Sequence, residues 1–246
     1  MDKDPRIADI DMPLHIAVIP DGNRRWAKAK GKLPQFGHKA GVEAYRKLLE
    51  NAGEFGIKYV TFYAFSTENW KRTESEVKAI MDLFLNYIKN YDSLIGPART
   101  KVRFVVIGNR DKFSKDVVKS IERIENLTKD NDDLIAYICV DYGGRSEIIN
   151  ATKRIAQDVR DGKLDIDDIT DKVFADNLYT YEAPDPDLLI RTSGEERISN
   201  FLLWQLAYTE FYFTDVPWPA FTKEDLEKAI EKYNSRDRRF GGVKEA

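Results

Sequence analysis

Segments with the pattern of buried strands alternate with segments of helical periodicity along most of this chain. The strand-like segments, rich in β-branched and aromatic residues, lie at 14–19, 58–66, 101–108, 134–142, 187–191 and 210–214. Helices are predicted at 39–56, 74–95, 114–129, 144–162, 171–179 and 222–239. Such alternation favours right-handed crossovers and a sheet covered on both faces. We therefore expect an α/β fold: an N-terminal extension over residues 1–13, then one domain over 14–242 with a mainly parallel six-stranded sheet flanked by helices.

The charge balance and the lack of long apolar segments exclude several classes of protein. The chain has 39 Lys and Arg against 42 Asp and Glu, which argues against a general nucleic-acid binder. No apolar segment approaches the roughly eighteen residues of a membrane span, and residues 1–13 lack the pattern of a targeting peptide. We expect a soluble, cytoplasmic protein. Cys139, the single cysteine, lies in an apolar segment and is expected to be a core thiol.

The chain lacks the common nucleotide-binding motifs. Neither a G-x-x-x-x-G-K-[ST] loop nor a G-x-G-x-x-G turn after a strand is present, which disfavours kinases and dehydrogenases. The segment DDITD, residues 167–171, matches by letters the Asp-rich magnesium motif of the all-helical trans-prenyltransferases. Because it precedes a short helix in an alternating chain, we interpret these acids as solvated residues at a helix start.

The polar segment after the first predicted strand has the composition of an anion site. In open parallel sheets, ligands bind beyond the carboxyl ends of the strands. This strand exit reads Asp21, Gly22, Asn23, Arg24, Arg25 and Trp26, which predicts a short loop opening a helix. A glycine, free N–H groups at a helix start and an arginine can together bind phosphate, and Asp21 is more naturally a Mg²⁺ ligand. The alternative is an Asp N-cap before a solvated basic turn.

Two further strand exits carry polar clusters. Residues 64–76 include Asn69, Trp70 and Arg72, and form a segment long enough to act as a lid. Thr73 and Glu76 in this segment fit a helix capping box, so Glu76 also has a purely structural interpretation.

The exit at the fifth predicted strand places Arg191 before Arg197 and Ser199. Two arginines and a serine there can form a second phosphate site. The alternative is a pair of surface salt bridges to Glu195 and Glu196.

Taken together, these segments resemble the cis-prenyltransferases, the family that includes undecaprenyl diphosphate synthase. The resemblance runs in order from His15 to Gly242. The blocks that carry it are HIAVIPDGNRRWA, GHKAG, YAFSTENWKR, DYGGR, PDLLIRTSGEERISNFLLWQLAYTEFYFTDVPWP and RRFGG. It implies a Mg²⁺-dependent enzyme that binds two diphosphates, with a hydrophobic tunnel between the sheet and the helices.

The resemblance also implies roles for individual residues. The catalytic residues would be Asp21 and Asn69, and Asp21 and Glu210 would hold Mg²⁺. The allylic diphosphate would contact Gly22, Asn23, Arg24, Arg25, Trp26, His38 and Arg72. Isopentenyl diphosphate would contact Arg191, Arg197, Ser199, Arg239 and Gly241. A mobile loop would contain Ser66, Thr67, Glu68, Asn69, Trp70 and Glu76. The tunnel would be lined by Phe62, Ala64, Ile80, Phe84 and Leu134.

The expected reaction adds isopentenyl diphosphate to an allylic diphosphate with Z geometry and releases diphosphate, giving a medium- or long-chain polyprenyl diphosphate. The proton acceptor stays unassigned: His38 is either catalytic or a structural hydrogen-bonding group, and His15 is interpreted as structural. Arg24 and Pro34 differ from many bacterial members, where Gly and Arg are frequent, and Ala220 stands where Asp is common. The starter is therefore open between farnesyl and geranylgeranyl diphosphate.

The resemblance further implies a homodimer in which the segment of Arg239 and Gly241 reaches the partner's isopentenyl site. A lipid-like product predicts peripheral contact with the inner face of the membrane. The alternatives are a short-chain Z-prenyl diphosphate synthase, a non-catalytic scaffold subunit of a heteromeric prenyltransferase, and a different diphosphate-handling enzyme such as a phosphohydrolase.

Overall fold

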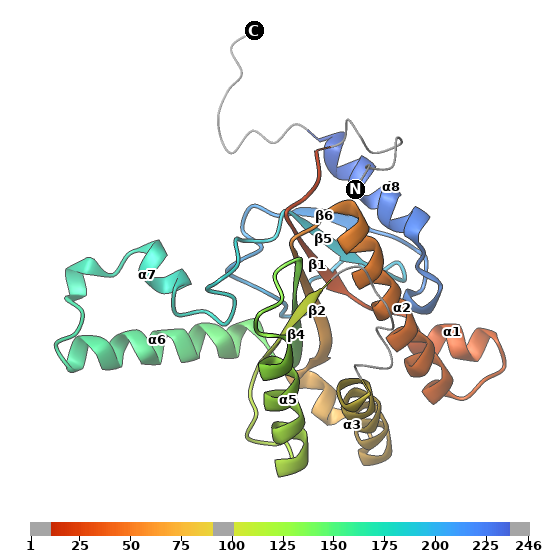
Figure 1. The fold of residues 1–246 in the computed structure, drawn as a ribbon, viewed down its shortest axis with the longest axis horizontal. Coiled ribbons are helices and arrows are strands. Elements are labelled where there is room, and N and C mark those ends of the chain that lie inside the picture. The colour runs from red at the N-terminus through yellow and green to blue at the C-terminus, as the bar shows by residue number, and fades with distance from the viewer. Residues whose placement is uncertain (1–10, 91–100, 237–246) are drawn as a thin grey trace, which may run out of the picture.

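Six parallel strands form one sheet in the computed structural model, which describes residues 11–90 and 101–236 (Figure 1). The strands are β1 (His15–Ile19), β2 (Tyr59–Ser66), β3 (Val102–Ile107), β4 (Leu134–Tyr142), β5 (Leu188–Arg191) and β6 (Glu210–Phe213). Their order across the sheet is β3-β4-β2-β1-β5-β6, and every neighbouring pair is parallel. The predicted single-domain α/β fold is confirmed.

Helices connect the strands. The α-helices are α1 (Asn23–Ala29), α2 (Pro34–Phe55), α3 (Glu74–Lys89), α5 (Lys115–Thr128), α6 (Gly144–Arg160), α7 (Asp171–Ala175) and α8 (Lys223–Asn234). The 3-10 helices are η2 (Thr67–Lys71), η3 (Ile166–Asp168) and η4 (Trp218–Ala220). Side chains of Thr73, Ser114, Thr170 and Thr222 accept backbone N–H groups at helix starts, which explains where four of the α-helices begin.

Four predicted helix boundaries differ from the structure by four or more residues. The helix predicted to start at residue 39 begins at Pro34, because proline fits the first turn, where its missing N–H has no intrahelical partner. The helix predicted to reach residue 179 ends at Ala175; the Tyr179 N–H donates instead to Glu147, at 2.8 Å. The helix predicted to end at residue 95 ends at Lys89, and the helix predicted to end at residue 239 ends at Asn234.

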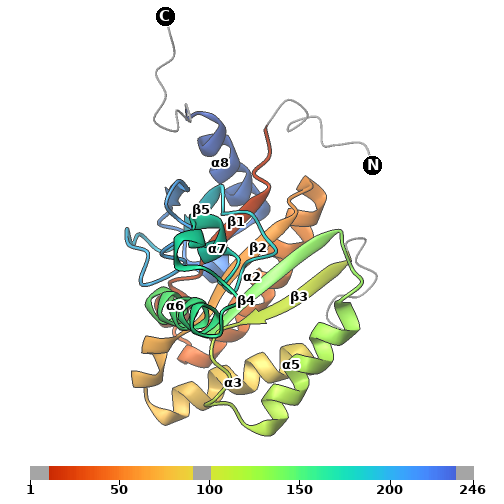
Figure 2. The same ribbon diagram turned by 90° about the vertical axis from the view of Figure 1, so that its left-hand side faces the viewer.

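The sheet is buried on both faces, as a parallel sheet flanked by helices requires. Ile16 and Val18 of β1 join the larger core cluster, to which α2, α3, α5 and α8 contribute. Ala17 and Ile19 join a smaller cluster on the opposite face with Phe201, Leu202 and Leu206. Cys139 lies in that second cluster as a fully buried free thiol, and burial raises its pKa. Figure 2 shows α3 and α5 running side by side along one side of the sheet.

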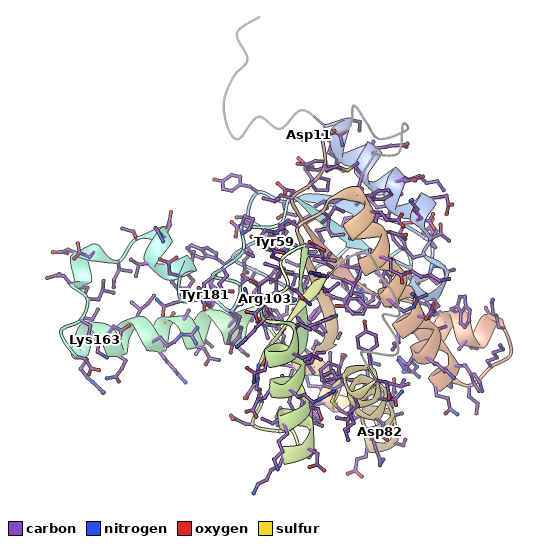
Figure 3. The ribbon with its side chains drawn as sticks, viewed as in Figure 1. Asp11, Tyr59, Asp82, Arg103, Lys163 and Tyr181 are labelled. Carbon is purple, nitrogen blue, oxygen red and sulfur yellow. The ribbon has the colours of Figure 1, made fainter. Side chains whose placement is uncertain are left out.

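Two segments extend away from the body of the molecule. Helices α6 and α7 form an arm, with Lys163 at its tip (Figure 3). On the other side, the connection between α1 and α2 projects outward (Figure 1). No helix within residues 11–90 and 101–236 is long and apolar enough to cross a membrane.

Candidate active site

The strand order reverses at β1, which pairs with β2 on one side and with β5 on the other. At such a switch point the carboxyl ends of neighbouring strands leave a crevice for ligands. Asp21 follows β1 and Arg191 ends β5, and Arg191 Nη2 lies 3.0 Å from Asp21 Oδ2. The Thr192 hydroxyl lies 2.8 Å from both the Asp21 N–H and the Asp21 carbonyl oxygen, which fixes the two segments together.

Asp21 carries a stabilised negative charge. Partial burial opposes its ionisation, but hydrogen bonds from Arg191, the Gly22 N–H and Arg25 outweigh it and lower the pKa of Asp21. Gly22 N donates to Asp21 Oδ1 at 2.7 Å, and Arg25 Nη2 donates to the same oxygen at 3.2 Å. An ionised carboxylate can ligate a metal ion that also binds phosphate oxygens, and the neighbouring arginines can bind the same phosphates.

Asp21 is not the N-cap of α1, so that alternative was wrong: the N-cap is Gly22, in the left-handed region at φ 97°. A Cβ atom at Gly22 would lie 2.5 Å from Ser193 Oγ, so this position needs glycine for both conformation and space. Trp218 supports the same loop through an N–H that donates to the Asp21 carbonyl at 2.9 Å. Trp218 was not predicted as part of the site, and its sequence offers only the signal of an aromatic next to prolines.

Helices α1 and α2 approach closely at a glycine. A Cβ atom on Gly37 would collide with the Asn23 carbonyl oxygen, and one on Gly41 would lie 2.5 Å from Asn23 Oδ1. Asn23 Oδ1 and Arg191 Nε are buried polar atoms that find no hydrogen-bond partner among the described residues. Buried polar atoms are normally paired, so these two are suited to a bound ligand.

A cavity of about 660 Å³ extends from these residues into the protein. Its polar part is lined by Asp21, Asn23, His38, Ser66, Glu68, Asn69, Arg72, Arg191, Arg197, Ser199 and Asn200. Its apolar part is lined by Val42, Tyr45, Phe62, Ala64, Ile80, Leu83, Phe84, Tyr87 and Ile138. Four of the five residues predicted for the tunnel therefore line one cavity. Leu134 does not line it; this residue is buried in the same hydrophobic core as Phe62.

A second hollow of about 560 Å³, here called the outer cleft, adjoins the cavity and shares Asp21, Asn23, His38 and Arg72 with it. The cationic side chains that line it are Arg24, Arg25, Lys28, Lys32 and Arg72, and Asp21 is the single acidic one. Such an excess of positive charge favours a multiply charged anion. Trp26 lines neither hollow; its ring lies under Lys30 Nζ, 4.3 Å from the ring centroid.

Glu76 organises the side chains where the two hollows meet. Arg72 Nη1 donates to Glu76 Oε1 at 2.8 Å, Arg24 Nη1 lies 3.6 Å from Oε2, and His38 Nε2 lies 3.8 Å from Oε1. Burial lowers the pKa of His38, and the charge on Arg72 lowers it further, so the imidazole is neutral near pH 7. A neutral ring nitrogen can accept a hydrogen bond or a proton.

The predicted capping box at Thr73 and Glu76 forms only in part. Thr73 Oγ1 accepts the Glu76 N–H at 3.4 Å, but the Glu76 carboxylate is engaged with Arg72. A complete capping box forms instead at the start of η2, where Asn69 Oδ1 accepts the Ser66 N–H at 3.0 Å.

Two residues absent from the predicted site hold the segment of η2 in place. Trp70 Nε1 donates to Asp141 Oδ1 at 2.7 Å, and Asp141 is buried. Asn200 Nδ2 donates to Glu68 Oε1 at 3.1 Å, and Asn200 Oδ1 accepts the Arg145 N–H. An acid at the end of an apolar strand is the signal that could have identified Asp141.

The segment after β5 brings the second group of predicted residues to the cavity. Arg191 Nη1 donates to Ser199 Oγ at 2.8 Å and to the Arg197 carbonyl oxygen. Glu195 joins the two predicted anion sites, because it pairs with Arg197 and also lies 3.3 Å from Arg25 Nη1. Arg197 therefore forms the predicted salt bridge to Glu195 and also lines the cavity.

Glu210 lies at the amino end of the parallel strands, whereas Asp21 lies beyond their carboxyl end. It begins β6 in register with Leu188, which is in register with Ile16, five residues before Asp21. At about 3.3 Å per residue this is roughly 16 Å along the strands. The Glu210 carboxylate pairs with Arg236. The expectation that Asp21 and Glu210 share one metal ion is therefore wrong within a single chain.

A magnesium ion fits the donor set around Asp21. The described residues contain no group of three or more His, Cys, Asp or Glu that could hold a metal ion by themselves. Mg²⁺ commonly takes one or two protein carboxylates and completes its shell with water and substrate phosphates, so one ionised carboxylate beside an anion cleft suffices.

Other sequence features lie away from the cavity or outside the described residues. Asp167 and Asp168 are exposed in the first turn of η3, and Asp171 is exposed at the start of α7, which agrees with solvated helix-start acids. His15 is buried between the Pro184 carbonyl, at 2.6 Å, and Thr61 Oγ1, at 2.8 Å, a structural position. Arg239 and Gly241 lie outside the described residues.

Comparison with known proteins shows the family of this chain. A family model described as "Putative undecaprenyl diphosphate synthase" matches residues 19–241. An isoprenyl transferase of Fusobacterium nucleatum is 51% identical over 234 residues, covering 95% of this chain and 98% of that protein. An isoprenyl transferase of Clostridium perfringens is 49% identical over 234 residues, covering 95% and 91%.

Solved structures give the same family. The lavandulyl diphosphate synthase of Lavandula x intermedia, in complex with dimethylallyl diphosphate, has a TM-score of 0.89 and 37% identity, covering 93% of this chain and 98% of that one. A structure titled "probable undecaprenyl diphosphate synthase" from Campylobacter jejuni has a TM-score of 0.76 and 32% identity, covering 94% and 100%. This chain is therefore a prenyl-transferring enzyme and belongs to the cis-prenyltransferase family of undecaprenyl diphosphate synthases and isoprenyl transferases.

Proposed function

We propose that this enzyme condenses isopentenyl diphosphate with a farnesyl or geranylgeranyl diphosphate starter and elongates the product with Z geometry. The product is a medium- or long-chain polyprenyl diphosphate, and inorganic diphosphate is released. One observation carries this proposal: a single cavity joins a polar end containing Asp21 and Arg191 to an apolar interior lined by Phe62 and Ala64. A polyprenyl diphosphate has the same two parts, a charged head and an apolar chain.

The two anion sites suggest how the substrates are arranged. The allylic diphosphate is assigned to the outer cleft, where Arg25 and the Gly22 loop adjoin Arg72. The isopentenyl diphosphate is assigned to Arg191, Arg197 and Ser199. Both groups contact Asp21 or its immediate neighbours, so the two reacting ends would meet at the entrance to the cavity. Positioning of this kind lowers the barrier of a bimolecular reaction.

Electrostatic stabilisation of the leaving group is the main catalytic contribution that these residues can supply. Breaking the allylic C–O bond places additional negative charge on diphosphate, and preorganised guanidinium and N–H groups stabilise it. Mg²⁺ held by Asp21 would neutralise part of the diphosphate charge. The isopentenyl double bond then forms the new C–C bond, and loss of a proton gives the Z alkene. His38 is neutral and adjoins both hollows, but no residue is assigned as the proton acceptor.

The test is incubation with Mg²⁺, radiolabelled isopentenyl diphosphate and one starter at a time, with the extracted products sized by chromatography. The proposal predicts a ladder that ends at one dominant length with farnesyl or geranylgeranyl diphosphate. The lavandulyl diphosphate synthase neighbour makes dimethylallyl diphosphate a necessary third starter. A short product from it alone would favour the short-chain alternative. No incorporation by folded protein would favour a scaffold subunit, and diphosphate turnover without isopentenyl diphosphate would indicate a phosphohydrolase.

The remaining proposals concern assembly and location. We propose a homodimer, in which Arg239 and Gly241 reach the partner's isopentenyl site, and a cytoplasmic enzyme that contacts the membrane peripherally. Sedimentation equilibrium tests the dimer. Deletion of residues 237–246 should raise the KM for isopentenyl diphosphate while the dimer persists, and an unchanged KM would contradict the role of this segment.

A further inference from the structure

The connection between α1 and α2 is an unusually exposed part of the chain. Every residue from 28 to 36, here called the α1–α2 corner, is exposed. Figure 1 shows this connection projecting from the body of the molecule. Lys28, Lys30 and Lys32 lie in the corner together with Leu33 and Phe36.

The charge of this segment differs from that of the whole chain. Residues 22–42 contain no Asp or Glu, and their basic residues are Arg24, Arg25, Lys28, Lys30, Lys32 and Lys39. The complete chain has a net charge of −3. Positive charge is therefore concentrated locally on an otherwise acidic protein, which makes this surface complementary to a negatively charged one.

Apolar side chains stand beside these cations. Leu33 is 60% exposed and Phe36 is 48% exposed, although apolar residues of this size are usually buried. Lys32 Nζ lies 5.9 Å from the centroid of the Phe36 ring, and Lys30 Nζ lies 4.3 Å from that of the Trp26 ring. Exposed apolar residues next to lysines are typical of protein surfaces that lie in a lipid headgroup region.

The corner also forms part of the rim of the proposed active site. Lys28, Lys32, Leu33 and Pro34 all line the outer cleft, which adjoins the cavity. A surface that binds lipid at this position would hold the entrance of the cleft next to the bilayer.

We propose that the α1–α2 corner is a docking surface for an anionic lipid bilayer. Lys28, Lys30 and Lys32 contact anionic headgroups, and Leu33 and Phe36 insert into the boundary between headgroups and acyl chains. The advantage to the enzyme rests on the proposed function, because a polyprenyl product would leave the cleft beside the phase in which it dissolves. The binding itself depends only on the surface described here.

The experiment is cosedimentation of the full-length protein, without substrates, with two kinds of vesicle. One kind is pure phosphatidylcholine, and the other contains phosphatidylglycerol in addition. The proposal predicts binding to the anionic vesicles, little binding to the neutral ones, and release at high salt, because screening weakens attraction between exposed charges. Absence of binding to anionic vesicles, or equal binding to both kinds, would overturn it.

Two variants test the surface itself. Phe36→Gln/Lys30→Gln removes one apolar and one basic side chain, neither of which lines the cavity or the outer cleft. It should lower the partition coefficient for anionic vesicles about tenfold. Lys30→Glu alone should lower it as well. The matched control is Leu127→Gln/Lys119→Gln, which removes an exposed leucine and an exposed lysine from α5 and should bind like the unchanged protein.

Thermal unfolding of each variant confirms that the fold is retained. Equal loss of binding in the α5 control would show nonspecific adsorption and overturn the proposal. Retained binding by the variants of the corner would also overturn the proposal. It would do so even if a second copy of this chain or an acidic protein then proved to bind the corner. Condensation activity measured in detergent is a separate readout, so a protein that binds vesicles without condensing substrates would refute the proposed function alone.

Discussion

Asp21 and Arg191, which are 170 residues apart in the sequence, form an ion pair with 3.0 Å between Oδ2 and Nη2. The arginine is almost completely buried, and its Nη1 atom is engaged by Ser199 and the Arg197 carbonyl. One carboxylate thus aligns the guanidinium of the proposed isopentenyl site, while Arg25 of the proposed allylic site bonds to its other oxygen. Asp21 therefore links the two proposed substrate sites.

Replacing Asp21 should affect catalysis more than folding. Asp21→Asn keeps the size of the side chain but removes the charge that would hold Mg²⁺ and align Arg191. We expect the condensation rate to fall about 100-fold and the Mg²⁺ concentration needed for half-maximal rate to rise. Steady-state assays over a Mg²⁺ titration measure both. Asp167→Asn, in the exposed acidic segment, is the control, and equal rates in the two variants would contradict the assignment.

Glu195 is expected to compete with the diphosphate groups of the substrates for two arginines. Its carboxylate pairs with Arg25 and with Arg197, so a bound diphosphate must displace it from at least one of them. We expect Glu195→Gln to lower the inhibition constant of inorganic diphosphate about two- to fivefold, the range of an exposed ion pair. Glu196→Gln is the neighbouring control. Weaker inhibition in Glu195→Gln would show that Glu195 positions the arginines rather than competing for them.

Gly37 permits the close approach of α1 and α2. Gly37→Ala would push its Cβ atom against the Asn23 carbonyl, so we expect a loss of about 1–3 kcal/mol in the free energy of unfolding. Displacement of Asn23 and Arg25 should also raise the KM for the allylic substrate. Urea unfolding and initial rates measure the two effects. Gln35→Ala, at an exposed position of α2, should change neither value.

Ala64 lines the apolar part of the cavity. Ala64→Leu would fill space that Phe62 and Ile80 also line, so we expect shorter dominant products at a similar rate of the first condensation. Chromatography of the extracted products measures their length. Ala64→Ser, which adds a hydroxyl with little volume, is the control. An unchanged product distribution in Ala64→Leu would show that the growing chain does not occupy this part of the cavity.

His15 should make folding stability depend on pH. Burial lowers its pKa from the usual 6.5 to about 4, so the unfolded chain takes up the proton first as the pH falls. The contribution of neutral His15 to folding stability is fully present above pH 6.5 and is lost as the pH falls towards 4. The free energy of unfolding should therefore fall by about 2 kcal/mol between pH 7 and pH 5.

Urea unfolding at the two pH values tests this dependence. The His15→Gln variant should be less stable at pH 7 but show a flatter profile. His38→Gln should retain the contribution of His15. A profile of equal slope in His15→Gln and the unchanged protein would assign the pH dependence to other groups.

Local patterns were sufficient to predict the class of fold. Strand-like and helical periodicities depend on neighbouring residues, and β1, β2 and β4 are apolar because both faces of a parallel sheet are buried. The boundaries of α2 and α7 were less predictable. Pro34 is compatible with either a loop or a first helical turn, and the end of α7 depends on the distant Glu147.

The sequence by itself determined the phosphate-binding composition of the strand exits and the family, because these depend on residue type and order. Only the tertiary structure decided which of these strand ends lie next to one another. It joins Asp21 to Arg191 at the switch point and separates Asp21 from Glu210, because strand order and register set these distances. It also placed Asp141, Asn200 and Trp218 around the site. Their roles are contacts between segments distant in the sequence, and no local pattern encodes such contacts.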